Sequence, residues 1–64
     1  MRFNLIKFRR NQKLSQEKMA ALLDVSRTHY SDIENGKTTP SIGLAYKIQE
    51  VFNVDDVLEL LKKE

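Results

Sequence analysis

The chain of 64 residues has no cysteine, a single proline and no long apolar run. Without cysteine it can form neither a disulfide nor a thiolate metal site, so a reducing cytoplasm is the compartment that we expect. No apolar run approaches the ~18 residues of a membrane-spanning helix, so we expect no membrane partner. The opening residues, MRFNLIKF, are too polar and too few for a signal peptide.

A chain of this length holds one domain with a small core. At about 60 residues a domain buries only ~60% of the surface that its unfolded chain exposes, so its stability is marginal unless something reinforces it. Because disulfides and thiolate-bound metals are excluded, a second copy of the chain is the reinforcement that we expect.

The net charge of +2 is unevenly distributed along the chain. Residues 1–40 carry eight Lys or Arg and four Asp or Glu, whereas residues 41–64 carry three and five. The first part therefore has a net charge of +4 and the second a net charge of −2. A basic front and an acidic back favour an anionic partner on one side of the molecule, although a short chain can show such a split by chance.

Every segment of the sequence favours helix, with no strand signal, no repeat and no low-complexity segment. Leu5 and Phe8 lie three residues apart on the inner face of a first helix, predicted over residues 3–12. Ser15 is a good N-cap for a second helix over residues 16–23, because its hydroxyl can accept from an early backbone N–H. The residues that this second helix should bury are Met19, Ala20 and Leu23.

The third predicted helix follows Ser26, which is another N-cap. It stops at Gly36, which can adopt the left-handed conformation that closes a helix. At about 100° per residue, the residues Ser26, Tyr30 and Ile33 fall on one side of this helix and should form its buried stripe.

The fourth and fifth helices follow the only proline. Ser41 should cap the fourth helix, and Asn53, the commonest substitute for glycine at that position, should end it. Asp55 should cap a last helix in DVLELLKKE, whose acids come first and lysines last, as the helix dipole prefers. The predicted fold is therefore all-α, with five short helices. The residues expected to point inward from the fourth helix are Ile42, Ala45, Ile48 and Phe52.

Only the three residues LDV and the cap Ser26 join the second and third helices. So short a connection is typical of a helix-turn-helix, in which the second helix enters the major groove of DNA. The small side chain of Ala20 fits this arrangement because it lets the third helix cross close to the second. Short linkers also occur in bundles that bind no nucleic acid, so the turn needs support from the surface of the third helix.

The outer face of the third helix carries short or forked hydrogen-bonding side chains instead of the long Lys and Glu of an ordinary exposed helix. Arg pairs with guanine, Ser and Thr bond to several base edges, and Asp accepts from cytosine. The alternative is a solvated polar face with no partner. The residues on this face are Thr28, Ser31, Asp32 and Asn35, with Arg27 at the N-terminal corner.

The run LSQEKMAALLDVSRTHYSDIENGKTTPS resembles the lambda repressor/Cro-like (XRE) helix-turn-helix family. The resemblance covers about residues 5–58 and implies a five-helix, DNA-binding transcriptional regulator with double-stranded DNA as its partner. The domain is then expected at residues 5–60 and the helix-turn-helix motif at residues 16–35. The matching residues are Leu14, Ser15, Gln16, Ala20, Val25, Ser26, Ile33, Glu34, Asn35, Gly36, Pro40 and Ser41.

The resemblance also assigns roles to individual residues. It implies that Gln16 clamps a phosphate and braces the first recognition residue, and that Arg9 and Glu34 form a structural ion pair. The residues that it implies as base readers are Arg27, Thr28 and Asp32. It also implies contacts to the DNA backbone, near the following loop, from Asn35, Lys37 and Thr38. Ser31 can make such a contact as well.

Three features depart from the family pattern. Asp24 stands where the family usually has glycine, in a left-handed position that aspartate tolerates at some cost. Tyr30 replaces a branched aliphatic residue on the buried stripe, so its hydroxyl must reach an edge or a partner. The segment NVDDVLELL is one residue short of the usual spacing, which leaves the angle of the last helix open.

Other chemistries find little support in the sequence. His29, Ser31 and Asp32 include the residue types of a catalytic triad, but neighbours on one helix cannot converge in triad geometry, so His29 is read as an exposed residue near DNA. There is no Gly-rich phosphate loop and no paired-His metal spacing. The tail DDVLELLKKE is short and mixes both charge signs, unlike a membrane-surface helix. We therefore expect no enzyme, no metal, no cofactor and no small-molecule ligand.

Two classes of function remain open. The first is a sequence-specific DNA-binding regulator, expected to act as a repressor on an inverted-repeat operator. The second is a protein-interaction module on the same scaffold, such as an antitoxin. The sequence holds no extra segment long enough to wrap a toxin, which favours the first.

A homodimer is expected because one recognition helix reads too few base pairs to find a site in a genome. The acidic, leucine-rich end of the chain is free for a partner, with residues 62–64 as the rim of the interface. The alternative is that Leu58 and Leu61 close the core of the monomer. The expected apolar anchors of the dimer are Val57, Leu58 and Leu61.

Overall fold

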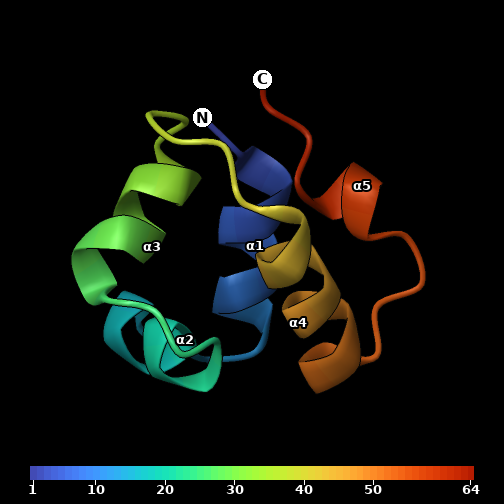
Figure 1. Cartoon of the computed structure of the whole chain (residues 1–64), viewed down its shortest axis with the longest axis horizontal. Coiled ribbons are helices and arrows are strands. Elements are labelled where there is room, and N and C mark those ends of the chain that lie inside the picture. Colours follow the sequence, from blue (N-terminus) through green and yellow to red (C-terminus); the bar gives the residue numbers. More distant parts are fainter.

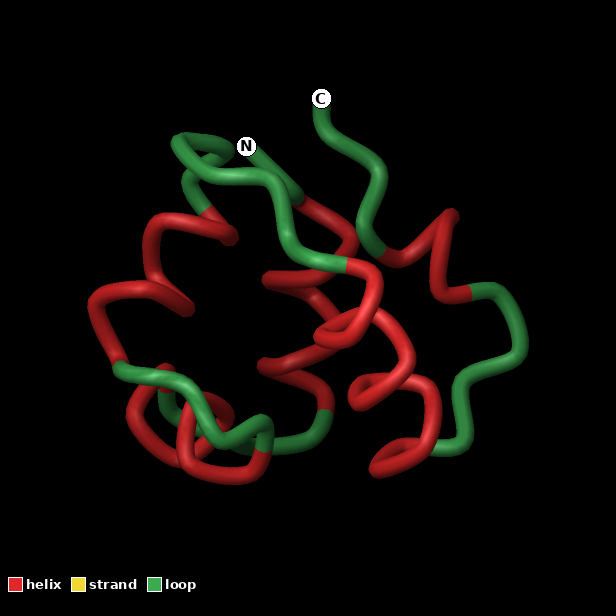
Figure 2. Tube along the Cα trace, in the orientation of Figure 1, coloured by secondary structure: helices red, strands yellow, loops and turns green.

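The computed structural model describes all 64 residues as five α-helices joined by short loops, without any strand (Figures 1 and 2). This confirms the predicted all-α fold. No helix is long and apolar enough to cross a membrane. The helices are α1 (Phe3–Asn11), α2 (Gln16–Leu22), α3 (Arg27–Glu34), α4 (Ile42–Phe52) and α5 (Val57–Leu60).

Serine hydroxyls cap α2, α3 and α4, at the three positions predicted from the sequence. Ser15, Ser26 and Ser41 each precede the first helical residue and accept a hydrogen bond of 3.1 Å from the backbone N–H three residues later. Each cap satisfies one of the backbone donors that the first turn of a helix leaves without a partner. The starts of these helices are therefore determined by local chemistry.

The three residues predicted to be left-handed have positive φ, and Lys13, after α1, is a further left-handed residue that was not predicted. Gly36 has φ 80°, Asn53 has φ 55° and Asp24 has φ 60°. After α3, the Gly36 N–H donates to the Ile33 carbonyl and the Lys37 N–H donates to the Asp32 carbonyl. This pair of bonds is a Schellman motif, which requires a left-handed residue at the position that Gly36 occupies.

The last helix differs from its prediction. It is capped by Asp56, whose carboxylate accepts from the Glu59 N–H at 3.1 Å, and not by Asp55. It also ends at Leu60, so residues 61–64 extend beyond it. The cap belongs to the aspartate whose side chain reaches the early N–H, and with two adjacent aspartates the sequence alone does not distinguish them.

A core of nine buried apolar side chains joins the five helices. At its edge, the rings of Phe8 and Phe52 meet edge to face, with centroids 5.2 Å apart and planes at 87°. This geometry is favourable for aromatic pairs and fastens α4 to α1. The buried apolar residues are Leu5, Met19, Ala20, Leu23, Tyr30, Ile33, Leu44, Ile48 and Leu60.

Two of the predicted inward residues are exposed. Ser26 lies at the surface because its side chain serves as the cap of α3. Ile42 is 75% exposed, and Leu44 is buried in its place. At about 100° per residue, Ile42 lies roughly 120° around α4 from Ile48, too far to share the stripe that faces the core.

The helices divide around α1, which lies in the centre of the molecule with α2 and α3 on one side and α4 and α5 on the other (Figure 1). Both chain termini lie at one end, beside the loop that joins α3 to α4. The N-terminal amine of Met1 donates to the Glu64 carbonyl at 2.7 Å, and the Glu64 N–H donates to the Met1 carbonyl at 2.8 Å. The start and end of the chain are thus paired next to that loop.

Candidate nucleic-acid interface

The turn between α2 and α3 is closed by backbone hydrogen bonds. The Val25 N–H donates to the Ala20 carbonyl at 3.0 Å, and the Asp24 N–H donates to the Ala21 carbonyl at 3.2 Å. Ala20 is almost fully buried at this point, where its small side chain lets α3 pack directly on α2. The result is the short two-helix unit that the sequence predicted.

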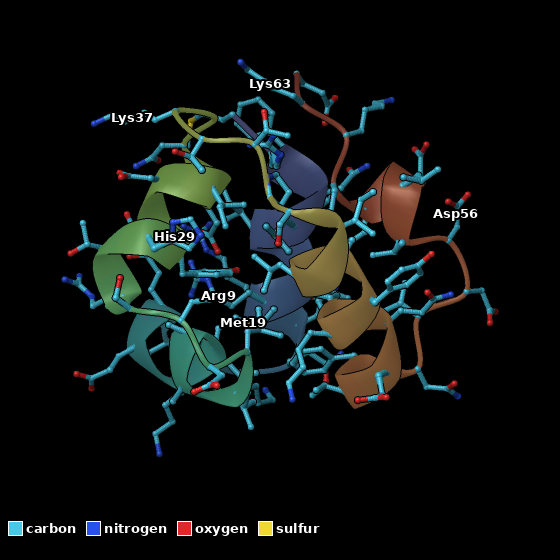
Figure 3. The ribbon with its side chains drawn as sticks, viewed as in Figure 1. Arg9, Met19, His29, Lys37, Asp56 and Lys63 are labelled. Carbon is cyan, nitrogen blue, oxygen red and sulfur yellow. The ribbon has the colours of Figure 1, made fainter.

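The inner face of α3 is fixed by the buried carboxylate of Glu34, which is only 2% exposed. Arg9 of α1 donates to it at 2.7 Å, from Nε to Oε2, and the Gln16 amide of α2 donates to Oε1 at 3.0 Å. Tyr30 donates its hydroxyl to Oε2 from within α3. One carboxylate therefore links three helices, and Figure 3 shows Arg9 between α1 and α3.

The surroundings of this carboxylate shift the pKa values of the groups in the network. Burial raises the pKa of Glu34, but the hydrogen bonds from Arg9, Tyr30 and Gln16 outweigh it, so that its pKa lies below the usual value. Burial first, and then the bond to Glu34, raise the pKa of the Tyr30 phenol well above its ordinary range. The hydrogen bond to Glu34 likewise raises the pKa of Arg9. Glu34 is therefore an anion and Tyr30 a neutral donor at physiological pH.

The outer face of α3 has no such partners. Arg27, Thr28 and Asn35 are exposed, and Ser31 and Asp32 are half-buried. No hydrogen bond or ion pair within the chain uses these five side chains. Their donors and acceptors remain available to an external ligand.

The loop after α3 extends this face. Lys37 is exposed and its side chain projects away from the body of the protein (Figure 3). Thr38 is half-buried and lies next to it in the chain. The loop, the outer face of α3 and Gln16 at the start of α2 together hold all eight residues for which DNA contacts were predicted.

Gln16 has an additional contact that the sequence did not reveal. It was predicted to clamp a phosphate, and its amide nitrogen in fact donates to Glu34. A side-chain amide carries two N–H groups, so this bond leaves one donor and also restrains the side chain. The partner of Tyr30 was equally unassigned, although Glu34 follows it by four residues and such pairs meet on one side of a helix.

The three residues predicted as dimer anchors differ in exposure. Leu58 is 79% exposed, whereas Val57 and Leu61 are half-buried against the core. Val57 and Leu58 both border a wholly apolar hollow of about 300 Å³ between α4 and α5. The largest exposed neighbours of Leu58 are Ile42, which was predicted to point inward, and Tyr46, which was assigned no role. The prediction for α4 is wrong at Ile42, whereas Ile48 is buried and Phe52 packs against the core as predicted. The hollow is lined by Ile42, Ala45, Tyr46, Val57 and Leu58.

Known proteins resemble this chain over most of its length. The ImmF control region 10 kDa protein of Bacillus phage phi105 is 46% identical over 59 residues, which make up 91% of this chain and 63% of that protein, slightly less than two thirds. An uncharacterized HTH-type transcriptional regulator of Archaeoglobus fulgidus is 39% identical, over 89% of this chain and 83% of its own length. The control protein C.MunI of a Mycoplasma species is 42% identical, over 78% of this chain and 81% of its own length.

A comparison with solved structures finds no match. The helix-turn-helix family profile matches residues 5–57, which include α1 from its third residue, all of α2 to α4 and the first residue of α5. This match covers far more than half of the chain, and it includes the turn between α2 and α3 and the outer face of α3. The chain belongs to the Cro/repressor-type (XRE) helix-turn-helix family and is a transcriptional regulator with a helix-turn-helix DNA-binding domain.

Proposed function

We propose that this protein is a repressor that binds an inverted-repeat operator in double-stranded DNA as a homodimer, with α3 in the major groove. The observation that carries the proposal is the difference between the two faces of α3. Its inner face is linked to α1 and α2 through Glu34, while its outer polar side chains make no hydrogen bond or ion pair within the chain. A helix that is rigidly held and has free hydrogen-bonding groups on the other side suits base readout.

The proposed base readers lie along this outer face. Arg27 and Thr28 occupy the first turn of α3, which is the part of a recognition helix that approaches base edges. Arg27 can pair with guanine through two N–H groups, and Asp32, one turn further along, can accept from the amino group of cytosine. The DNA-binding unit in this proposal is residues 5–60, with the helix-turn-helix motif at residues 16–35.

The proposed phosphate contacts flank the base readers at both ends. Gln16 begins α2, and its second amide N–H can bond to a phosphate while the first holds it to Glu34. Lys37 supplies a positive charge from the loop beyond α3. These contacts fix the register on the duplex and do not depend on its sequence. The full set is Gln16, Ser31, Asn35, Lys37 and Thr38.

The proposed dimer uses the apolar surface between α4 and α5. Leu58 is 79% exposed and Tyr46 is 66% exposed, beside Ile42 on the same hollow. Large exposed apolar side chains that gather in one place are typical of a protein interface. The chain measures 25 × 23 × 23 Å between its Cα extremes, so two copies side by side are of the right size for recognition helices ~34 Å apart.

Repression is the simplest consequence of such binding. A dimer on two half-sites one turn apart covers the intervening duplex and excludes other proteins from it. The test is a binding-site selection from random genomic fragments with the pure protein, followed by footprinting. We expect an enriched inverted repeat with two protected half-sites. Recovery of fragments without a shared motif would overturn sequence-specific binding, and protection of a single half-site would overturn the dimer.

A further inference from the structure

Arg2 is a buried cation at the end of the molecule where the termini meet. It is only 4% exposed although it lies before the first helix. Its Nη1 donates to the Ile33 carbonyl at 2.7 Å and to the Thr38 carbonyl at 3.0 Å, and its Nε donates to the Leu61 carbonyl at 3.0 Å. Its backbone N–H donates to the Glu34 carbonyl at 2.8 Å.

No carboxylate pairs with this guanidinium. Its charge is instead balanced by backbone carbonyls at the ends of two helices, because Ile33 lies in the last turn of α3 and Leu61 directly follows α5. The carbonyl end of a helix carries a partial negative charge that favours a cation. Since α3 has no basic residue in its own last turn, Arg2 supplies that charge from the other end of the chain.

The loop beyond α3 has few other bonds. The Schellman motif holds it as far as Lys37, but no backbone N–H or carbonyl of residues 38–40 bonds to another backbone group. The hydrogen bond from Arg2 to the Thr38 carbonyl is the bond that ties this part of the loop to the body of the protein. Figure 1 shows the N-terminal segment next to this loop.

We propose that Arg2 is a positioning residue for DNA binding: it holds the loop with Lys37 and Thr38 in the conformation that contacts phosphates. The inference rests on the proposed function of that loop. Arg2 does not itself reach DNA, since its side chain is buried and its donors are directed at carbonyls. It acts by removing freedom from the loop before binding, so that the complex does not bear the entropy cost of ordering it.

The test compares Arg2→Met with Lys7→Met, which removes the same charge from an exposed site on α1 near α5. All measurements are made well below the unfolding transition of each variant. We expect Arg2→Met to bind all DNA sequences roughly tenfold more weakly than Lys7→Met, since ordering even one or two residues on binding has a cost of that order. The slope of log affinity against log salt should fall by ~0.9 for each phosphate that the loop no longer neutralises.

A double-mutant cycle with Lys37→Ala distinguishes positioning from general stability. If Arg2 acts through the loop, Lys37→Ala should cost much less affinity in the Arg2→Met background than in the wild type. Arg2→Lys keeps the charge, but its three N–H donors share one nitrogen and do not reproduce the fork by which Nε and Nη1 reach the Leu61 carbonyl and the loop, so its affinity should be intermediate. Should Arg2→Met fail to fold, Arg2→Lys carries the same cycle. Strictly additive effects would overturn the inference.

Amide hydrogen exchange provides a readout that needs no DNA. Loss of the Arg2 bonds should speed exchange at Gly36 and Lys37, whose N–H groups donate to the Ile33 and Asp32 carbonyls at the start of the loop, and leave the middle of α3 protected. If the wild type binds no specific site, the proposed function fails, but faster exchange confined to the loop still supports the role of Arg2 in ordering it. Unchanged exchange in the loop overturns that role even if DNA binding is confirmed.

Discussion

The hydroxyl of Tyr30 donates to the carboxylate of Glu34 one turn further along α3, and both side chains are almost fully buried. Tyrosine is a departure from the branched aliphatic residue of the family pattern, and this bond gives its hydroxyl the partner that burial demands. It also adds a third donor to a carboxylate that Arg9 and Gln16 already bind. The departure therefore strengthens the link between the recognition helix and the rest of the protein.

Replacing Glu34 should be severely destabilising. Glu34→Gln leaves Arg9 half-buried without its counter-ion, and removal of one member of a buried ion pair typically costs about 3–5 kcal/mol. That is a large share of the total stability of a domain this small. Urea denaturation measures the loss. Glu59→Gln is the matched control. The 3.8 Å ion pair between Glu59 and Lys62 is exposed, so its loss should lower the free energy of unfolding by less than ~1 kcal/mol. Equal effects of the two variants would contradict the structural role of Glu34.

The free energy of unfolding should fall in acid because of the same group. The pKa of Glu34 is lower in the folded protein than in the unfolded chain, so its contribution is complete above the unfolded value of about 4.5 and is lost as the pH falls through the folded value. Tyr30→Phe removes one of the bonds that lower this pKa, and its stability should depend less steeply on pH in that window. Urea denaturation at a series of pH values below about 6 measures both curves. Parallel curves for the two proteins would show that Tyr30 does not influence the carboxyl.

Asp24→Gly should stabilise the turn between α2 and α3. Asp24 has φ 60°, a conformation that costs a residue with a Cβ atom about 1–2 kcal/mol and costs glycine nothing. Part of this gain is offset by the greater freedom of glycine in the unfolded chain, so we expect a net gain of about 0.5–1 kcal/mol. Thermal unfolding should show a rise of a few degrees. Asp24→Ala removes the same charge but keeps the Cβ atom, and a similar rise in that variant would point to the charge instead.

Substitution of a base reader and substitution of a phosphate contact should have different effects on the affinity and sequence selectivity of DNA binding. Arg27→Ala should lose about 1–3 kcal/mol on the best site and relax selection at one base pair. Lys37→Ala should weaken binding to every sequence and lower the salt slope by ~0.9. Site selection and salt titration of both variants measure the difference. An unchanged consensus with Arg27→Ala would remove Arg27 from the base readers.

The dimer can be tested at Leu58 without damaging the core. Leu58→Lys places a charge in the proposed interface, and because Leu58 is exposed the monomer should keep its stability. Leu61→Lys is the contrasting variant, since Leu61 packs against the core and its replacement should lower the free energy of unfolding. Sedimentation at micromolar concentration should show the wild type as a dimer and Leu58→Lys as a monomer. A wild type that stays monomeric, both free and on DNA, excludes the proposed dimer.

The sequence by itself was enough to predict the features that depend on neighbouring residues. The caps Ser15, Ser26 and Ser41 and the left-handed ends Gly36 and Asn53 lie where they were predicted. Each depends on whether one side chain can bond to, or fit, the backbone within a few residues of itself. The polar face of α3 was predictable for the same reason, because helical periodicity alone sets which residues share a side.

Apart from the Arg9–Glu34 ion pair, which the family resemblance implied, only the tertiary structure decided which groups meet across the fold. The rotation of α4 exposes Ile42 and buries Leu44, the aspartate that caps α5 is Asp56, and the Arg2 guanidinium binds carbonyls 31, 36 and 59 residues away. Nothing near Arg2 in the chain distinguishes it from an exposed arginine, because its partners are backbone carbonyls, which every residue carries. Such contacts depend on how the helices pack around one shared core, and that packing is a property of the whole chain.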